Sequence, residues 1–154
     1  MLIAFDFYDQ AWNFEGIGFT QHFGLRKDRF LQKGSVMIDR ATGLMWQQAG
    51  SAKYMSLAEA AKYIVQLNTG KGFAGYRDWR LPTLEETMSL MEPVQNRGLY
   101  IDAKFDTKQR WIWTSDIYSA GVAWVAYFNL GGCLRNFVAG INNYVRAVRV
   151  PIGR

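Results

Sequence analysis

Apolar residues recur at helical spacing in two segments of the chain, and each segment begins with a capping box. The first box is Ser-Leu-Ala-Glu at residues 56–59, followed by apolar positions on one helical face at Ala60, Ile64 and Leu67. Asn68 and Gly70 end this pattern. The spacing therefore predicts a short amphipathic helix after residue 56.

The second capping box is Thr-Leu-Glu-Glu at residues 83–86, directly after Pro82. Its apolar stripe continues until Pro93 and consists of Leu84, Met88 and Met91. The pattern predicts a second short amphipathic helix. The loop before it, residues 75–82, carries Trp79 between charged residues.

Most of the other apolar segments have the alternation or the aromatic content of β-strands. Residues 35–39 and 41–46 predict a hairpin with Gly43 in its turn. Further strands are predicted at residues 111–115, 122–128 and 144–150, and Phe5 and Phe7 alternate with Asp6 as in a half-buried strand. Two short helices packed on short antiparallel strands give an α+β fold.

The last predicted strand alternates between two faces. Val145, Ala147 and Arg149 share one face, and the other face carries Tyr144, Arg146, Val148 and Val150. One face therefore includes Arg149 and the other Arg146. We expect these arginines, and Asp78 with Arg80 in the preceding loop, to be partly buried and paired rather than catalytic or phosphate-binding.

Composition sets the scale of the domain. The chain has 154 residues, 49% of them hydrophobic and 16% aromatic, which is enough for one compact core. Cys133 is the single cysteine, so an intramolecular disulfide is excluded. No apolar run is long enough to span a membrane, and the first residues lack a secretion-signal pattern, so we expect no membrane insertion and leave localisation open.

Charge and candidate chemistry argue against several functions. The net charge is +5, but the basic residues are scattered, so we expect no nucleic-acid partner. His22 is the single histidine, and Cys133 has no base near it in the sequence. We therefore expect no catalytic residues, no resident metal and no cofactor, which means that the chain is not an enzyme.

Four segments resemble, in order and spacing, the Lcl C-terminal domain family: Ala-Thr-Gly-Leu-Met-Trp-Gln at 41–47, Gly-Tyr-Arg-Asp-Trp-Arg-Leu-Pro-Thr at 75–83, Trp-Thr-Ser at 113–115 and Tyr-Val-Arg-Ala-Val-Arg at 144–149. The resemblance covers about residues 29–150. It implies a C-type lectin-like fold for residues 29–154, with residues 1–28 as an extension or extra strands of the same domain. Recurring positions in the motifs favour core packing over sugar stacking for the tryptophans Trp46, Trp79, Trp111, Trp113 and Trp124.

Within that family, the C-terminal part is most similar to variable proteins of diversity-generating retroelements, in which template adenines of AAY codons are replaced. Such replacement never yields Trp, Gln, Met, Lys or Glu. These five types make up about a quarter of the chain before residue 116 but are absent from residues 116–142, apart from Trp124. The resemblance implies that the tryptophan at the position of Trp124 does not vary in this family. Phe128 is expected to be a second position that does not vary. Residues 116–142 are thus predicted to form a hypervariable region.

The predicted function is non-enzymatic ligand binding by this hypervariable surface. Aromatic and arginine side chains supply affinity at interfaces, and glycine and asparagine allow a loop to adapt. We expect Phe137 and Leu134 to face solvent, since exposed apolar patches mark contact with a partner. The full set of predicted ligand-binding residues is Asp116, Ile117, Tyr118, Ala120, Val122, Val125, Tyr127, Asn129, Leu130, Gly132, Leu134, Arg135, Asn136, Phe137, Val138 and Ile141.

The ligand would be a protein or glycan on another cell or particle, and neither its identity nor the oligomeric state follows from the sequence. Calcium-dependent sugar binding by this fold uses Glu-Pro-Asn and Trp-Asn-Asp motifs. The chain has only Glu92-Pro93-Val94 and, after Asp106, the single carboxylate Asp116, so we expect calcium-independent binding. The alternative is a fixed adhesin that binds anionic glycans through its basic surface.

Overall fold

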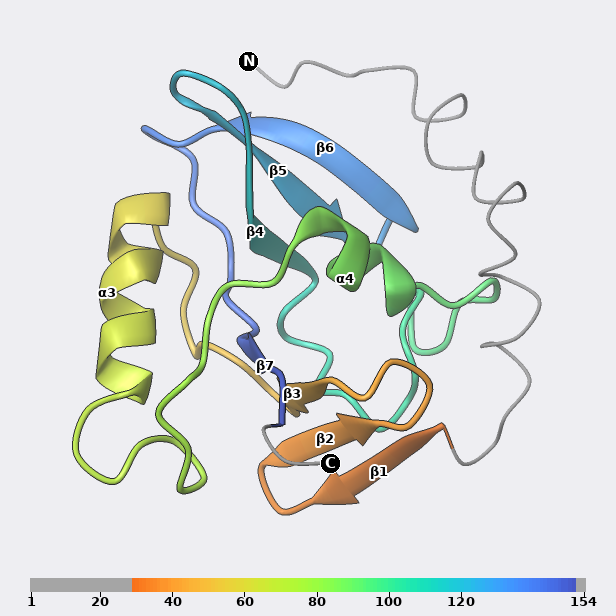
Figure 1. Cartoon of the computed structure of the whole chain (residues 1–154). Helices are drawn as coiled ribbons and strands as arrows, with labels where there is room; N and C mark the ends of the chain where they lie inside the picture. Colours follow the sequence, from red (N-terminus) through yellow and green to blue (C-terminus); the bar gives the residue numbers. More distant parts are fainter. Residues whose placement is uncertain (1–28, 152–154) are drawn as a thin grey trace.

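A computed structural model of the chain describes residues 29–151, which form two antiparallel sheets and two short helices (Figure 1). The four-stranded sheet has the order β1-β2-β3-β7, with bounds Phe30–Lys33, Val36–Asp39, Met45–Gln47 and Val148–Arg149. The three-stranded sheet has the order β4-β5-β6, with bounds Trp111–Ser119, Val122–Tyr127 and Gly132–Phe137. This arrangement confirms the predicted α+β class. The expected strand around Phe5 and Phe7 lies outside the described residues.

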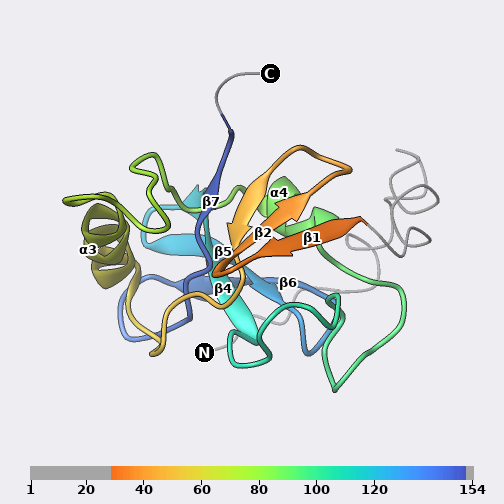
Figure 2. The same ribbon diagram turned by 90° about the horizontal axis from the view of Figure 1, so that it is seen from below.

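Both predicted helices form behind the capping boxes. Helix α3, Leu57–Leu67, begins after Ser56, whose side chain accepts from the Glu59 amide while the Glu59 carboxylate accepts from the Ser56 amide. Helix α4, Leu84–Ser89, is capped in the same way by Thr83 and Glu86. It ends before Met91, so the predicted apolar stripe was too long. Figures 1 and 2 show the two helices on opposite sides of β7.

The predicted hairpin is also present. Strands β2 and β3 pair with Ile38 opposite Met45, and Gly43 adopts a φ of +75° in the connection. Strand β1 adds to the outer edge of this hairpin. Arg29 at its start forms a buried ion pair with Asp39, with Nη2 2.8 Å from Oδ2.

The segment before and within β7 joins all three apolar clusters of the described core. Val145 packs with Trp113 and Val125, Ala147 packs with Trp79, and Val148 packs with Trp46. The predicted strand at 144–150 is only partly regular, because just Val148 and Arg149 form a strand. The rest of the segment bonds to several neighbours instead, including Ser51 and Gln47.

Arg146 is fully buried in this segment, and its guanidinium is bound by carbonyl and amide oxygens rather than by a carboxylate. Its guanidinium donates to the carbonyls of Ala49 and Asp106 and to the side-chain oxygen of Gln109. It also lies 4.8 Å from the ring centre of Phe105. The expectation of a buried, bonded arginine is confirmed, and the partners are two backbone carbonyls and one side-chain amide.

The tryptophans divide into core and surface members. Trp46, Trp79 and Trp113 are almost fully buried, as predicted for the motif tryptophans. The Trp79 indole donates to the carbonyl of Phe73 and the Trp113 indole to that of Met55, which satisfies two buried donors. Trp111 and Trp124, which were also expected to pack in the core, are only half-buried. Trp124 is therefore available at the surface of the three-stranded sheet.

Candidate ligand-binding surface

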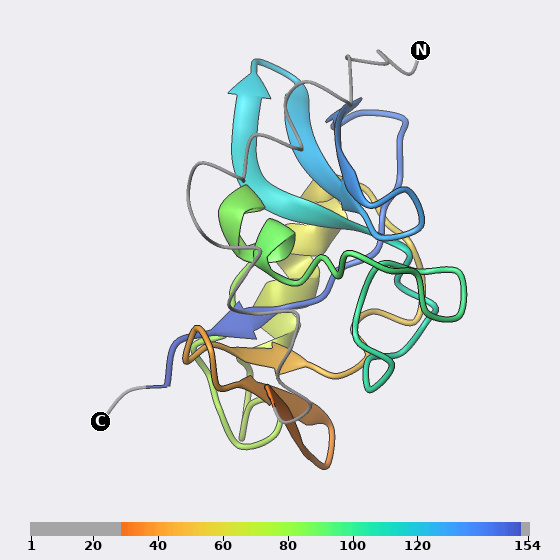
Figure 3. The same cartoon turned by 90° about the vertical axis from the view of Figure 1, so that its right-hand side faces the viewer.

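Residues 116–142 contain the end of β4, all of β5 and β6, and the turns between them. The turns use Gly121 and Gly131 at φ values of +75° and +73°, which other residues rarely adopt. Figure 3 shows this sheet at the opposite end of the molecule from the β1-β2 hairpin. The predicted variable segment is thus mainly a regular sheet with short turns. Strand β6 was not predicted from the sequence, because this segment has no clear strand or helix period.

Several predicted ligand-binding residues are exposed on this sheet. The exposed fraction is 59% for Ile117, 54% for Tyr118, 55% for Leu130 and 40% for Phe137. Ala120 in the β4-β5 turn is exposed as well. The predicted residues that are half-buried are Asp116, Val122, Tyr127, Asn129, Val138 and Ile141.

Other predicted residues are buried, and for these the expected exposure is wrong. Val125 packs in the core with Trp113, and Leu134, which we expected to face solvent, pairs with it across β5 and β6. Successive residues of a strand point to opposite faces, so one sheet face meets the core. The buried members of the predicted set on that face are Val125, Gly132, Leu134 and Asn136. Arg135 is also buried, but it lies on the opposite face, where its guanidinium contacts the Tyr118 ring.

The exposed face carries a cluster of two rings and one guanidinium. The rings of Tyr118 and Trp124 meet edge to face with their centres 6.0 Å apart. The Arg135 guanidinium carbon lies 3.9 Å from the Tyr118 ring centre and 5.7 Å from that of Trp124. Phe137 follows on the same strand as Arg135, opposite Val122. Tyr118, Trp124 and Arg135 thus form one cluster across the three strands, and Phe137 lies on the same side of β6 as Arg135.

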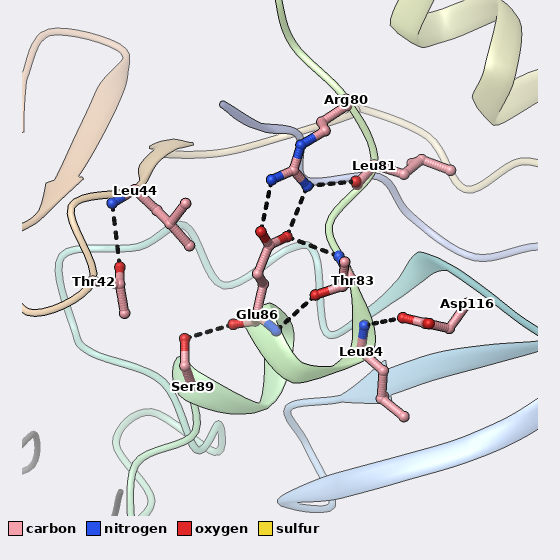
Figure 4. A network of polar contacts seen from close by, with 9 residues as sticks. All are labelled: Thr42, Leu44, Arg80, Leu81, Thr83, Leu84, Glu86, Ser89 and Asp116. Atoms are coloured by element: carbon pink, nitrogen blue, oxygen red, sulfur yellow. Dashed lines mark hydrogen bonds and ion pairs between the residues drawn. The ribbon is translucent and has the colours of Figure 1, made fainter. Parts of the chain in front are cut away.

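Asp116 attaches the beginning of this surface to α4. Its carboxylate accepts a hydrogen bond from the backbone amide of Leu84, the first residue of the helix (Figure 4). Next to this contact lies an open hollow of about 390 Å³. Its walls are Thr83, Leu84, Glu85, Asp116, Ile117 and Trp124.

Sequence reasoning did not assign a binding role to Thr83, Leu84 or Glu85, because the capping box accounted for them fully. The packing of β4 against α4 brings Asp116 next to Leu84, and this packing is part of the tertiary structure. A sequence motif alone carries no signal for it.

A hydrogen-bond network on the inner face of the sheet joins two polar residues of the segment to Asn143. Asn136 donates from its amide to the Tyr127 hydroxyl at 2.8 Å and, at 3.4 Å, to the side-chain oxygen of Asn143. Asn136 and Asn143 are both about 1% exposed. Asn136 therefore acts in folding, and a change there would leave buried polar groups without partners.

Two ion pairs fix the scaffold next to the surface. Arg80 pairs with Glu86 through two hydrogen bonds of 2.8 and 2.7 Å, and Arg149 pairs with Asp78 (Figure 4 shows the first pair). Burial opposes ionisation of Glu86, but hydrogen bonds from Arg80 and from the Thr83 amide outweigh it and lower its pKa. The expectation that Asp78, Arg80 and Arg149 are paired is confirmed, with Glu86 as the partner of Arg80.

Cys133 is a candidate nucleophile, and the acidic residues are candidate metal ligands. Burial raises the pKa of the Cys133 thiol to about 11, so at neutral pH it is protonated and weakly nucleophilic. Across residues 29–151, no three His, Cys, Asp or Glu side chains gather as metal ligands, and no helix is long and apolar enough to cross a membrane. His22 lies outside this range.

Comparison with known proteins gives one clear result. The family model described as the Lcl C-terminal domain matches residues 35–149, which is most of the chain and includes both sheets except β1. A search of curated proteins finds no match. The family match includes every motif that carried the resemblance, from Gly43 in the hairpin turn to Arg149 in β7. The chain belongs to the Lcl C-terminal domain family.

Proposed function

We propose that this chain is a non-enzymatic ligand-binding domain whose contact surface is the exposed face of the β4-β5-β6 sheet. The observation that carries the proposal is the exposure of Ile117, Tyr118 and Phe137 on that sheet. Exposing several large apolar side chains to water is unfavourable, and such a patch usually marks contact with a partner. Trp124 and Arg135 lie between them and are residue types that concentrate binding energy at interfaces.

The proposed fold type is C-type lectin-like. The family assignment supports it, and so does an α+β architecture with two short helices beside two small antiparallel sheets. A rigid scaffold that presents a separate sheet limits the conformational entropy lost when a ligand binds.

We further propose that a diversity-generating retroelement varies this surface. The absence of Trp, Gln, Met, Lys and Glu from residues 116–142, apart from Trp124, is the supporting observation. Folding allows variation at exposed positions such as Ile117, Tyr118 and Phe137, because their side chains lie outside the core. Positions such as Val125 and Asn136 must remain compatible with the core.

The genomic neighbourhood tests the retroelement. We expect a near-identical repeat of the segment encoding residues 116–142 downstream of the gene, next to a reverse transcriptase gene. Mismatches between the two copies should be confined to adenines of the repeat. A locus with neither the repeat nor the reverse transcriptase gene contradicts diversification and leaves a fixed binding domain.

A binding screen tests the surface itself. The purified domain is screened against candidate cell-surface proteins and glycans, and the Ile117→Ala and Phe137→Ala variants are measured against any ligand found. Loss of a central apolar contact should weaken binding by about tenfold or more. Val65→Ala on α3 is the matched control, because Val65 is 66% exposed but lies on a different element. Equal affinities for all variants would contradict the assigned surface.

The proposed binding is calcium-independent and involves no catalysis. Asp116 is the single acidic side chain of residues 116–142, and one of its oxygens is already bonded to the Leu84 amide. Calcium sites use six to eight oxygen ligands, often several carboxylates. Titration calorimetry with calcium checks this point, and uptake of calcium with micromolar affinity would contradict it.

The alternative function is a fixed adhesin that binds anionic glycans. The net charge of +5 favours it, together with exposed basic residues at Lys53, Lys108 and Arg110. Such binding should weaken steeply as salt is added, because ions screen exposed charges. Binding through Ile117 and Phe137 should change little with salt, so a salt series on the first ligand found separates the two functions.

A further inference from the structure

The hollow between α4 and the sheet presents hydrogen-bond acceptors and an aromatic ring to a ligand. Two amides at the start of α4 are already engaged, since the Leu84 amide donates to Asp116 and the Glu86 amide to the Thr83 hydroxyl oxygen (Figure 4). The carboxylate of Glu85 is exposed on the wall. No described residue donates to the second carboxylate oxygen of Asp116. An anionic group would therefore meet negative charge here, whereas a cationic group would be attracted.

We propose that this hollow receives a lysine or arginine side chain of a protein ligand, an inference that rests on the binding function proposed above. The hollow of about 390 Å³ is larger than one such side chain. Trp124 lines the hollow with an aromatic ring that can attract a cation, while Leu84 and Ile117 offer apolar contact to the methylene groups of the stem. Glu85 and Asp116 then accept hydrogen bonds from the charged end.

The charges around the hollow favour a cation in spite of the basic character of the whole chain. Arg135 is the cation that contacts the ring cluster, and it lies closer to Tyr118 than to Trp124. Among residues 29–151, the hollow is lined by the carboxylates of Glu85 and Asp116 and by no basic side chain. Local charges decide this interaction, because distant exposed charges are screened by salt.

Most of the hollow lies outside the positions that we propose to vary. Thr83, Leu84 and Glu85 belong to the scaffold, and Trp124 is the residue that the codon restriction cannot produce. Asp116 is held by a backbone amide of the scaffold. The hollow would thus be a largely constant subsite beside a variable surface, with Asp116 and Ile117 as its two wall residues inside the variable segment. Ligands of differently diversified copies would share one cationic side chain at this position.

The test uses the full chain and a small probe, N-acetylarginine amide, followed by the indole NMR signal of Trp124. That signal is assigned by its loss in Trp124→Phe. We expect saturable shifts with a millimolar dissociation constant, as is usual for one side chain. N-acetylcitrulline amide, the uncharged analogue, should bind about fivefold more weakly. Equal binding of the two probes, or no shift of Trp124 with either, would overturn the proposal.

Two substitutions assign the effect to the carboxylates. Glu85→Gln and Asp116→Asn each remove one charge, and the asparagine oxygen still accepts from the Leu84 amide. We expect each to weaken binding of the arginine probe about threefold. Glu59→Gln is the matched control, because it removes a charge from the first turn of α3 and glutamine preserves the capping box. Unchanged binding in both variants, with circular dichroism showing the native fold, would also overturn the proposal.

The probe titration and the ligand screen can fail separately. If the arginine probe binds at Trp124 but no ligand of the exposed sheet exists, the cationic subsite stands and the proposed function fails. If a protein ligand binds through Ile117 and Phe137 but Glu85→Gln does not change its affinity, the proposed function stands and the subsite fails.

Discussion

Arg149 in β7 forms a two-point ion pair with Asp78, the residue before Trp79 in the loop between the helices. Nε lies 2.7 Å from Oδ1 and Nη2 lies 3.2 Å from Oδ2. The same guanidinium is 3.9 Å from the ring centre of Tyr76. Arg149 therefore fixes the loop that carries a buried tryptophan to the strand that ends the domain.

Removing this contact should destabilise the domain. We expect Arg149→Ala to lower the free energy of unfolding by about 2 kcal/mol, because hydrogen bonds to charged groups are lost together with the contact to Tyr76. Urea denaturation measures the change. Arg77→Ala, an exposed arginine in the same loop, should change stability by less than about 0.5 kcal/mol. Equal effects of the two substitutions would show that the ion pair adds nothing.

Acid should weaken the domain through Glu86. Its pKa in the folded state is lowered below the ordinary glutamate value. Stabilisation by the ionised carboxylate is therefore present above about pH 5 and is lost as the pH falls through the folded-state pKa. Urea midpoints measured over this range should fall on acidification, and Glu86→Gln should make the dependence shallower. An unchanged slope in the variant would contradict the assignment.

The two faces of the sheet should respond differently to substitution. Val125→Ala leaves a cavity beside Trp113 and should lower the free energy of unfolding by about 2 kcal/mol. Ile117→Ala removes an exposed side chain and should change stability by less than about 0.5 kcal/mol. Thermal unfolding of the two variants, each compared with the parent chain, checks the contrast. Similar losses in both would contradict the assignment of faces.

Asp116 should contribute to the stability of α4. Asp116→Ala removes the acceptor of the Leu84 amide, and loss of such a helix cap costs about 1 kcal/mol. Asp116→Asn retains a side-chain oxygen and should cost less than half as much. Chemical denaturation of the two variants gives the comparison, and equal losses would indicate that the charge, rather than the hydrogen bond, provides the stability.

Cys133 should react slowly with alkylating agents. A thiol pKa of about 11 leaves about one thiolate in a thousand at pH 8. Iodoacetamide should therefore modify the native chain far more slowly than the urea-unfolded chain, as followed by mass spectrometry. Equal rates would show that the half-buried position does not protect the sulfur.

Local signals in the sequence were sufficient for the elements that depend on local chemistry. The capping boxes at Ser56 and Thr83 placed both helix starts, and Gly43 placed the hairpin turn, because these motifs satisfy backbone groups within a few residues. The motif tryptophans Trp46 and Trp79 were correctly predicted to be core residues.

The candidate surface was predicted less well because it depends on long-range contacts. Strand β6 has mixed glycine, polar and apolar residues, and its pairing with β5 is what separates buried Leu134 from exposed Phe137. The contact of Asp116 with Leu84 joins residues 32 positions apart. The sequence located the segment of the surface, but tertiary structure decides which of its side chains a ligand can reach.

The alternation of inward and outward residues in β5 and β6 also sets how this domain should be engineered. A combinatorial library that randomised every codon of residues 116–142 would place polar residues at Val125 and disrupt the Asn136 network in many clones, and those clones would misfold. A library restricted to Ile117, Tyr118 and Phe137 would keep the core intact. More of its members would then be folded candidates for selecting new binders.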